Sequence, residues 1–128
     1  MKRTNISSGA KWEDIVGYSR AVIVGNMVYI AGTTAIDEKG EVVGKNNPYE
    51  QTIKTLSIIK DALEKAGTSF DNVVRTRMYV TDISRWEEYG KAHGEIFKKT
   101  KPASTMVEVS ALINPEIMIE IEADAYIP

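Results

Sequence analysis

The feature that most constrains the fold is a strict alternation of side-chain type from Glu116 to Tyr126. Successive side chains of a strand point to opposite faces of its sheet, so a period of two predicts one long strand with two unlike faces. The apolar face would carry Ile117, Ile119, Ile121, Ala123 and Ala125, and the other face Met118, Glu120, Glu122, Asp124 and Tyr126. One side of the sheet is therefore expected to face a hydrophobic core.

The rest of the sequence predicts further strands and two helices. A hairpin is predicted over 21–30, because β-branched and aromatic residues flank the turn pair Gly25-Asn26. Asn47 and Pro48 are typical of a helix start, and Gly67 of its end. Further elements are expected at 41–43 (a short extended piece), 73–80 (strand), 84–99 (helix opened by a capping box at Ser84) and 104–109 (strand).

This order predicts an α+β fold: a mixed sheet with two helices on one face. Two helices leave the opposite face of the sheet uncovered, so a second copy of the chain is expected to cover it. The apolar stripe of the second helix would contain Trp86, Tyr89, His93 and Ile96 or Phe97. Gly90 and Gly94 would flatten one side of that helix for close packing on the sheet.

Length and composition set the broad class. The 128 residues suit a single domain spanning 1–128, and 43% of them are hydrophobic, as in ordinary globular proteins. The absence of cysteine excludes disulfides and thiol chemistry. The formal charge, 16 − 18 = −2, disfavours nucleic acid as a partner. The N-terminal residues do not resemble a signal peptide and no apolar run could cross a bilayer, so a cytoplasmic location is expected.

The acid row is the main candidate for chemistry. Glu120, Glu122 and Asp124 would lie about 7 Å apart on one strand face, where mutual repulsion raises at least one pKa and can create a general acid or base. The alternative is a solvated face whose acids pair with Arg75 and Arg77. Glu120, in the middle of the strand, is the member for which function is most plausible.

Other candidates are weaker. His93 is the only histidine, and its aromatic neighbours on the helix favour a packing role over metal binding or catalysis. Tyr18 precedes the first hairpin strand, where a phenol either contacts a ligand or packs in the loop. No serine-hydrolase elbow, phosphate-binding loop, dinucleotide fingerprint or calcium loop occurs, and no metal or cofactor is predicted.

A set of ordered motifs resembles the RidA/YjgF family of reactive-intermediate deaminases over nearly the whole chain. The motifs are Gly17-Tyr18-Ser19-Arg20-Ala21-Val22, residues 25–32 (GNMVYIAG), Gln51-Thr52, residues 71–76 (DNVVRT), Val80-Thr81-Asp82, Lys101-Pro102-Ala103, Val107-Glu108-Val109 and residues 119–123 (IEIEA). The resemblance implies a chorismate-mutase-like fold. It also implies a homotrimer whose sheets form a central barrel, with pockets between subunits and no cofactor.

The resemblance also implies which residues would form the pocket. Glu120 matches the family's pocket glutamate, which positions water, and the substrate-contacting positions match Tyr18, Ala31, Gly32, Thr33, Ser104 and Thr105. In active deaminases an arginine clamps the substrate carboxylate within a Pro-Ala-Arg-Ser pattern. This chain reads Pro102-Ala103-Ser104-Thr105, so Ser104 occupies the arginine position and offers no charge.

Two functions of different classes follow from this departure. The first is hydrolysis of an enamine, an imine or a related small C=N metabolite, with weak activity on 2-imino acids. The second is a non-catalytic trimer that binds a small ligand or regulates a partner. A ribonuclease, an older label for the family, is disfavoured by the acidic balance and the lack of a histidine pair.

Overall fold

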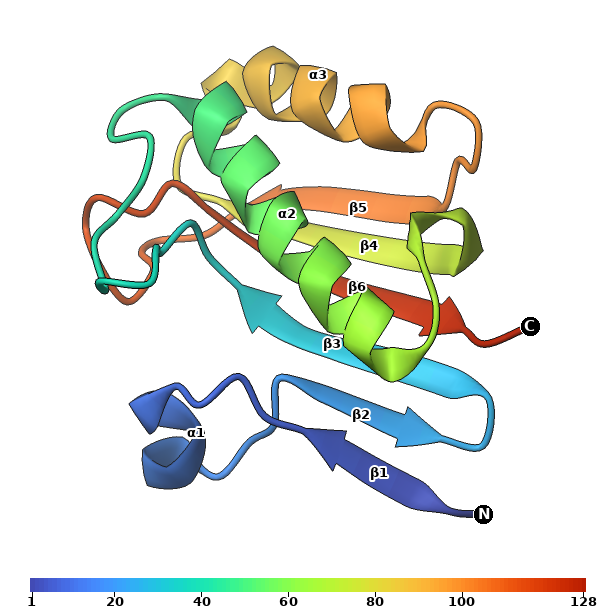
Figure 1. Ribbon diagram of the computed structural model, residues 1–128. Helices are drawn as coiled ribbons and strands as arrows, with labels where there is room; N and C mark the ends of the chain where they lie inside the picture. The colour runs from blue at the N-terminus through green and yellow to red at the C-terminus, as the bar shows by residue number, and fades with distance from the viewer.

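The long alternating strand lies in the middle of the sheet. In the computed structural model, which describes residues 1–128, β6 (Ile119–Tyr126) runs antiparallel to β3 (Met27–Thr33) on one side and to β4 (Val73–Val80) on the other. The full order is β1-β2-β3-β6-β4-β5 (Figure 1), with β1 at Arg3–Ile6, β2 at Ala21–Val24 and β5 at Ala103–Glu108. Only β5 is parallel to its neighbour, β4.

Two helices cover one face of this sheet (Figure 1). Helix α2 (Pro48–Ala66) crosses β3 and β6, and α3 (Trp86–Phe97) lies beside it. The alternate β6 residues 119, 121, 123 and 125 are all buried, which confirms the predicted apolar face and places the core between sheet and helices. The α+β class with helices on one face is therefore confirmed.

Helix α2 starts and ends where the sequence predicts. The Asn47 side chain accepts a hydrogen bond from the Glu50 N–H at 3.0 Å, and Gly67 ends the helix in the left-handed conformation at φ 91°. The sequence pattern did not predict that Gln51 is buried. Its amide donates to the Glu116 carbonyl and accepts from the Met118 N–H, both at 2.8 Å, so α2 holds the segment that leads into β6.

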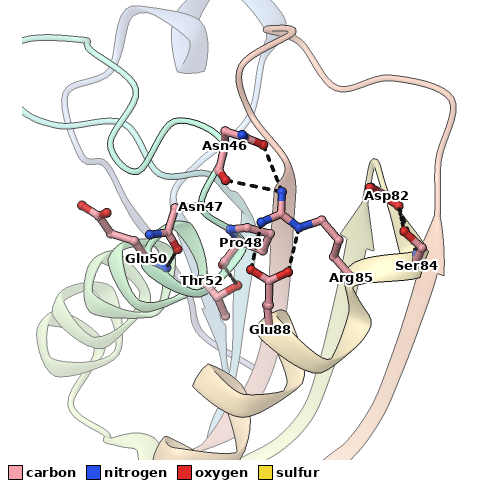
Figure 2. A network of polar contacts seen from close by, with 9 residues as sticks. All are labelled: Asn46, Asn47, Pro48, Glu50, Thr52, Asp82, Ser84, Arg85 and Glu88. Carbon is pink, nitrogen blue, oxygen red and sulfur yellow. Dashed lines mark hydrogen bonds and ion pairs between the residues drawn. The ribbon is translucent and has the colours of Figure 1, made fainter.

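The start of α3 differs from the prediction (Figure 2). A 3-10 turn, η2 (Ile83–Arg85), precedes α3, and Asp82 caps this turn: its carboxylate accepts the Ser84 N–H at 3.1 Å. Helix α3 itself begins after Arg85 without a side-chain cap, so the predicted capping box at Ser84 is wrong. Arg85 then donates to both oxygens of Glu88 and to Asn46, which ties α3 to the loop before α2. A short aspartate side chain readily accepts a hydrogen bond from the backbone N–H two residues later, which favours a turn at this point.

Two expectations about the α3 surface are wrong. Trp86, expected in the buried stripe, is 55% exposed, whereas Tyr89, Ala92 and Phe97 face the core. The glycines do not pack against the sheet either. A Cβ at Gly94 would meet nothing within 4 Å, and one at Gly90 would meet only the Trp86 ring. The side of the helix that carries the glycines faces away from the sheet.

The N-terminal segment contains two elements that the sequence pattern did not predict. Strand β1 extends the hairpin, and a short helix α1 (Lys11–Val16) lies at that edge of the sheet (Figure 1). The expected extended piece at 41–43 is reduced to a single bridge between Ile36 and Val42. A 3-10 turn, η1 (Phe70–Asn72), leads into β4. None of the helices combines the length and apolar character that a bilayer-spanning segment needs.

No helix covers the opposite face of the sheet. Strand alternation directs Tyr29, Arg77, Tyr79, Glu122 and Asp124 to this uncovered face, since their neighbours in each strand are buried under the helices. Tyr29 is 46% exposed there. The uncovered face is thus both charged and aromatic.

Candidate active site around Glu120

Glu120 lies near the start of β6 and points to the uncovered face. Its two neighbours in the strand, Ile119 and Ile121, are buried under the helices, and its partner across the ladder on β4 is Tyr79. The side chain is part-buried and forms no hydrogen bond or ion pair within the chain. Burial raises the pKa of Glu120 above the ordinary glutamate range, the charge of Glu122 raises it further, and Arg20 opposes both.

A bulge in β3 makes room for this carboxylate. The pairing of β3 with β6 shifts register between Ile30 and Thr33, and Ala31 and Gly32 fall in the shift. A Cβ built on Gly32 would overlap the Glu120 carboxylate. Glycine at position 32 is therefore what allows Glu120 to lie against the strand backbone.

Arg20 and Tyr18 complete the group around Gly32. The Arg20 guanidinium donates to the Thr33 hydroxyl at 2.7 Å and to the Gly32 carbonyl at 3.1 Å. The Tyr18 ring lies 5.8 Å from the guanidinium carbon, within cation–π distance. We call Tyr18, Arg20, Gly32, Thr33 and Glu120 the Glu120 half-site.

The structure thus brings together five of the seven predicted site residues: Tyr18, Ala31, Gly32, Thr33 and Glu120. Thr33 is buried, with 2% of its surface exposed. Its hydroxyl donates to the Ala31 carbonyl at 2.8 Å and accepts a hydrogen bond from Arg20. Thr33 therefore fixes the bulge. Its single O–H is already donated to Ala31, so the hydroxyl has no donor left for a ligand.

Ser104 lies elsewhere. It pairs in register with Thr76 on β4, and its side chain is on the helix-covered side of β5. The buried Thr76 hydroxyl is 2.8 Å from the Ser104 hydroxyl and 2.8 Å from His93 Nε2. The three groups form a chain of hydrogen bonds from α3 to the exposed edge of the sheet.

Thr105 points the other way from Ser104 and shares the uncovered face with Glu120. Strand β4 separates β5 from β6, so Thr105 is about 10 Å from the β6 backbone, the width of two strand spacings. Within one chain, neither Ser104 nor Thr105 lies beside Glu120. The predicted set is thus divided into two groups on different strands.

The other two acids of the row have partners. Glu122 accepts the Tyr79 hydroxyl at 2.8 Å, and this bond is the main reason that the pKa of Tyr79 is raised. Arg77 lies 3.4 Å from Asp124 and 4.0 Å from Glu122. The alternative interpretation of the row, pairing with strand arginines, therefore holds for Glu122 and Asp124, with Arg77 rather than Arg75 as the partner. Glu120, in contrast, forms no hydrogen bond or ion pair with Arg77 or Tyr79 of β4.

His93 is a packing residue, as its neighbours indicated. Its ring lies 4.7 Å from that of Phe97, and burial lowers its pKa, so the neutral ring is favoured beside the Thr76 hydroxyl. It lines a groove of about 250 Å³ with Gly94, Phe97, Lys98, Lys101 and Pro102, away from Glu120. No group of three or more histidine or acidic side chains is placed to hold a metal ion.

Arg20 is the member of the half-site that sequence reasoning did not select. The available signal was a lone cation between Tyr18 and the first buried residue of the hairpin, Ala21. Its backbone carbonyl accepts from the Ala31 N–H at 3.0 Å, so this position is fixed opposite the bulge. A residue at that position therefore lies beside the part of β3 that carries Gly32.

Comparison with known proteins agrees with this fold. The family model described as endoribonuclease L-PSP matches residues 9–127. A RutC family protein of Pyrococcus abyssi is 41% identical over 110 residues, with 85% of each chain covered. An uncharacterized protein of Streptomyces coelicolor is 34% identical over 122 residues, which cover 94% of this chain and 90% of the other.

Solved structures give the same relationship. A member of the highly conserved YjgF/YER057c/UK114 family from Mycobacterium tuberculosis superposes with a TM-score of 0.88 at 49% identity, covering 98% of this chain and 99% of the other. YyfA of Yersinia pestis, a protein of unknown function in the conserved Rid protein family, gives 0.87 at 30% identity, with 98% and 99% covered. The chain therefore belongs to the endoribonuclease L-PSP family, which is also called the YjgF or RidA family.

Proposed function

We propose that the protein hydrolyses a small enamine, imine or related C=N metabolite, with Glu120 as the base. The observation that carries this proposal is the state of the Glu120 carboxylate: part-buried, without a partner, and lying against the Gly32 backbone. A carboxylate without a structural partner is free to hold water. Its raised pKa brings it closer to the range in which a general base works well.

The reaction needs only water. Glu120 would orient a water molecule and take one of its protons as the oxygen attacks the C=N carbon. The nitrogen of the tetrahedral adduct would receive that proton from Glu120 and a second proton from the new hydroxyl. It would then leave as ammonia while the carbon becomes a carbonyl. One imine and one water thus give one carbonyl compound and one ammonia, with no redox change and no cofactor.

A second subunit would complete the site. Within one chain, Ser104 and Thr105 lie two strands from Glu120, and the uncovered face of the sheet has no partner element. A homotrimer, with its sheets forming a central barrel, would place the β5 strand of one subunit opposite the Glu120 half-site of another. The ligand pocket would then lie in the cleft between subunits, with Ser104 in place of a clamping arginine. A cytoplasmic location belongs to the same proposal.

The second candidate function is a non-catalytic trimer that binds a small ligand or regulates a partner. The observation that favours it is Ser104, which is uncharged and already hydrogen-bonded to Thr76. A charge-assisted bond contributes about 1.5–3 kcal/mol, and a serine cannot replace that contribution toward a substrate carboxylate. Binding without turnover would follow if water is never activated.

A coupled assay separates the two functions. A serine or threonine dehydratase generates the enamine and imine, and the rate of their loss is measured with and without the protein. Slow acceleration that disappears in Glu120→Gln and persists in Glu122→Gln supports the hydrolase. We expect low turnover of 2-iminopropionate in the native chain. Equal rates with and without the protein, at every substrate tested, would leave the binding trimer as the function.

The Ser104→Arg variant probes the missing clamp directly. If Ser104 faces the pocket of a neighbouring subunit, an arginine there should increase turnover of 2-iminopropionate at unchanged trimer mass. A fully active native chain would contradict our expectation of weak activity, because another cation would then hold the carboxylate.

A further inference from the structure

Arg20 is the cation of the Glu120 half-site, and its orientation is fixed by uncharged groups. Its two hydrogen bonds go to the Thr33 hydroxyl and the Gly32 carbonyl, and the Thr33 hydroxyl is itself bonded to the Ala31 carbonyl. Because these acceptors are neutral, the guanidinium is held in place without direct neutralisation of its charge.

No carboxylate forms an ion pair with Arg20. Glu13 and Glu120 both feel its charge, yet the four ion pairs of the chain involve Lys45, Arg77 and Arg85 only. Glu13 is bonded instead by the hydroxyl and the backbone N–H of Ser8. A part-buried arginine is normally paired, so an unpaired one beside a candidate site indicates a missing anion.

The guanidinium retains donors that the chain does not use. Of its five N–H groups two are bonded, the Nε–H is buried without a partner, and Nη1 and Nη2 each keep one N–H. A planar pair of N–H groups matches the two oxygens of a carboxylate. The unpartnered carboxylate of Glu120, which is an acceptor, also lies against Gly32.

We propose that Arg20 binds the anionic group of the ligand, and that the ligand is a small carboxylate which also presents a hydrogen-bond donor or a bound water to Glu120. The inference rests on the proposed function for the location of the site only. It assigns charge recognition to the same chain as Glu120, since Ser104 contributes no charge. Arg20 would hold the ligand from the segment before β2, whereas the family's clamping arginine would lie at the Ser104 position on β5.

The test compares two probes of nearly the same shape: pyruvate and its neutral analogue pyruvamide. Their affinities for the full-length assembled protein are measured by NMR titration at low salt. We expect pyruvate to bind about tenfold more tightly than pyruvamide. Arg20→Gln should reduce that ratio to about one, whereas Arg20→Lys should retain part of it. The matched control is Arg75→Gln on β4, which should keep the native ratio.

Three results would overturn the inference: no binding of pyruvate, equal affinity for the two probes in the native protein, or an unchanged ratio in Arg20→Gln. An Arg20→Gln variant that dissociates into monomers while its assembled fraction keeps the ratio would make Arg20 an interface residue instead. The outcomes separate this inference from the hydrolase. A ratio that depends on Arg20, without turnover by any variant, supports the inference and contradicts the hydrolase. Turnover that depends on Glu120, with a ratio independent of Arg20, does the opposite.

Discussion

The Glu120 carboxylate lies so close to Gly32 that a side chain at position 32 would occupy the same space. The two residues come from neighbouring antiparallel strands, at the point where the β3 bulge shifts the register. Backbone and carboxylate can approach in this way only because position 32 has no Cβ.

Replacing Gly32 with alanine should displace Glu120. We expect loss of ligand binding and turnover with a change of less than about 1 kcal/mol in the free energy of unfolding, because only the end of the flexible Glu120 side chain has to move. Urea denaturation and the dehydratase-coupled assay measure the two effects. The matched control is Gly94→Ala, where the new Cβ meets nothing; it should raise helix stability by up to about 1 kcal/mol. Full activity in Gly32→Ala would contradict the site.

The raised pKa of Glu120 predicts a pH-dependent effect of Glu120→Gln. The folded protein binds this proton more tightly than the unfolded chain, so the group favours folding at low pH, and that contribution is lost as pH rises through the folded pKa. Glutamine does not ionise. Relative to the native chain, the variant should therefore gain stability between about pH 4.3 and neutral pH, and show no such gain at more acidic pH.

Glu88 provides a control of opposite sign. Its pKa is lowered chiefly by the hydrogen bond from Arg85, so its contribution to folding is present at neutral pH and is lost as pH falls through the folded pKa. Glu88→Gln should lose stability at neutral pH, and that loss should shrink in acid. Thermal unfolding from pH 3 to pH 8 records both trends, and parallel curves for both variants would refute the assignment to Glu120.

The Thr76 hydroxyl joins Ser104 to His93, and we expect its removal to be costly. Thr76→Val keeps the shape of the buried side chain but leaves His93 Nε2 without its partner. An unsatisfied buried polar group costs about 1–3 kcal/mol, which urea denaturation can resolve. Thr105→Val, at an exposed neighbouring position of β5, should change stability by less than about 0.5 kcal/mol. Equal effects of the two variants would show that the hydrogen-bond chain contributes little.

The proposed trimer has a direct measurement. Light scattering should give about three times the chain mass of 14.2 kDa, because the uncovered face of the sheet exposes Tyr29 and Val107 to solvent in a single chain. Charged substitution at the centre of that face, such as Tyr29→Lys, should lower the mass. A native chain that is monomeric at micromolar concentration would contradict both the trimer and the cleft between subunits.

The central part of the fold could be predicted from the sequence because its signals are local. Alternation in 119–126 gave the faces of β6, and Asn47 and Gly67 gave the ends of α2. Strand β1 and helix α1 were missed since their residues are mostly exposed and carry no hydrophobic period. The start of the second helix was assigned to Ser84 because its sequence fits a capping box, and only the backbone conformation shows that a 3-10 turn capped by Asp82 comes first.

The site was predictable residue by residue but not in its arrangement. Alternation places Glu120, Glu122 and Asp124 on one face, and cannot say that Arg77 and Tyr79 engage only the last two. The pairing of β4 with β6 is a long-range property, and even this pairing places Tyr79 directly opposite Glu120. The choice of Glu122 and Asp124 depends on diagonal side-chain contacts between the two strands. Arg20 was missed for the same reason: its partners, Gly32 and Thr33, are assigned only once the bulge is known.

The strand order has a consequence for how the chain reaches this structure. Strand β6 follows all the others in the sequence, yet it inserts between β3 and β4 (Figure 1). Until it pairs, the sheet exists as two separate pieces, each with an open edge that can join the wrong partner. The contact between Gly32 and Glu120 joins residues far apart in the sequence, so the half-site exists only once β6 has paired with β3. A chain truncated before β6 would carry two half-sheets, each with an unpaired edge that favours aggregation.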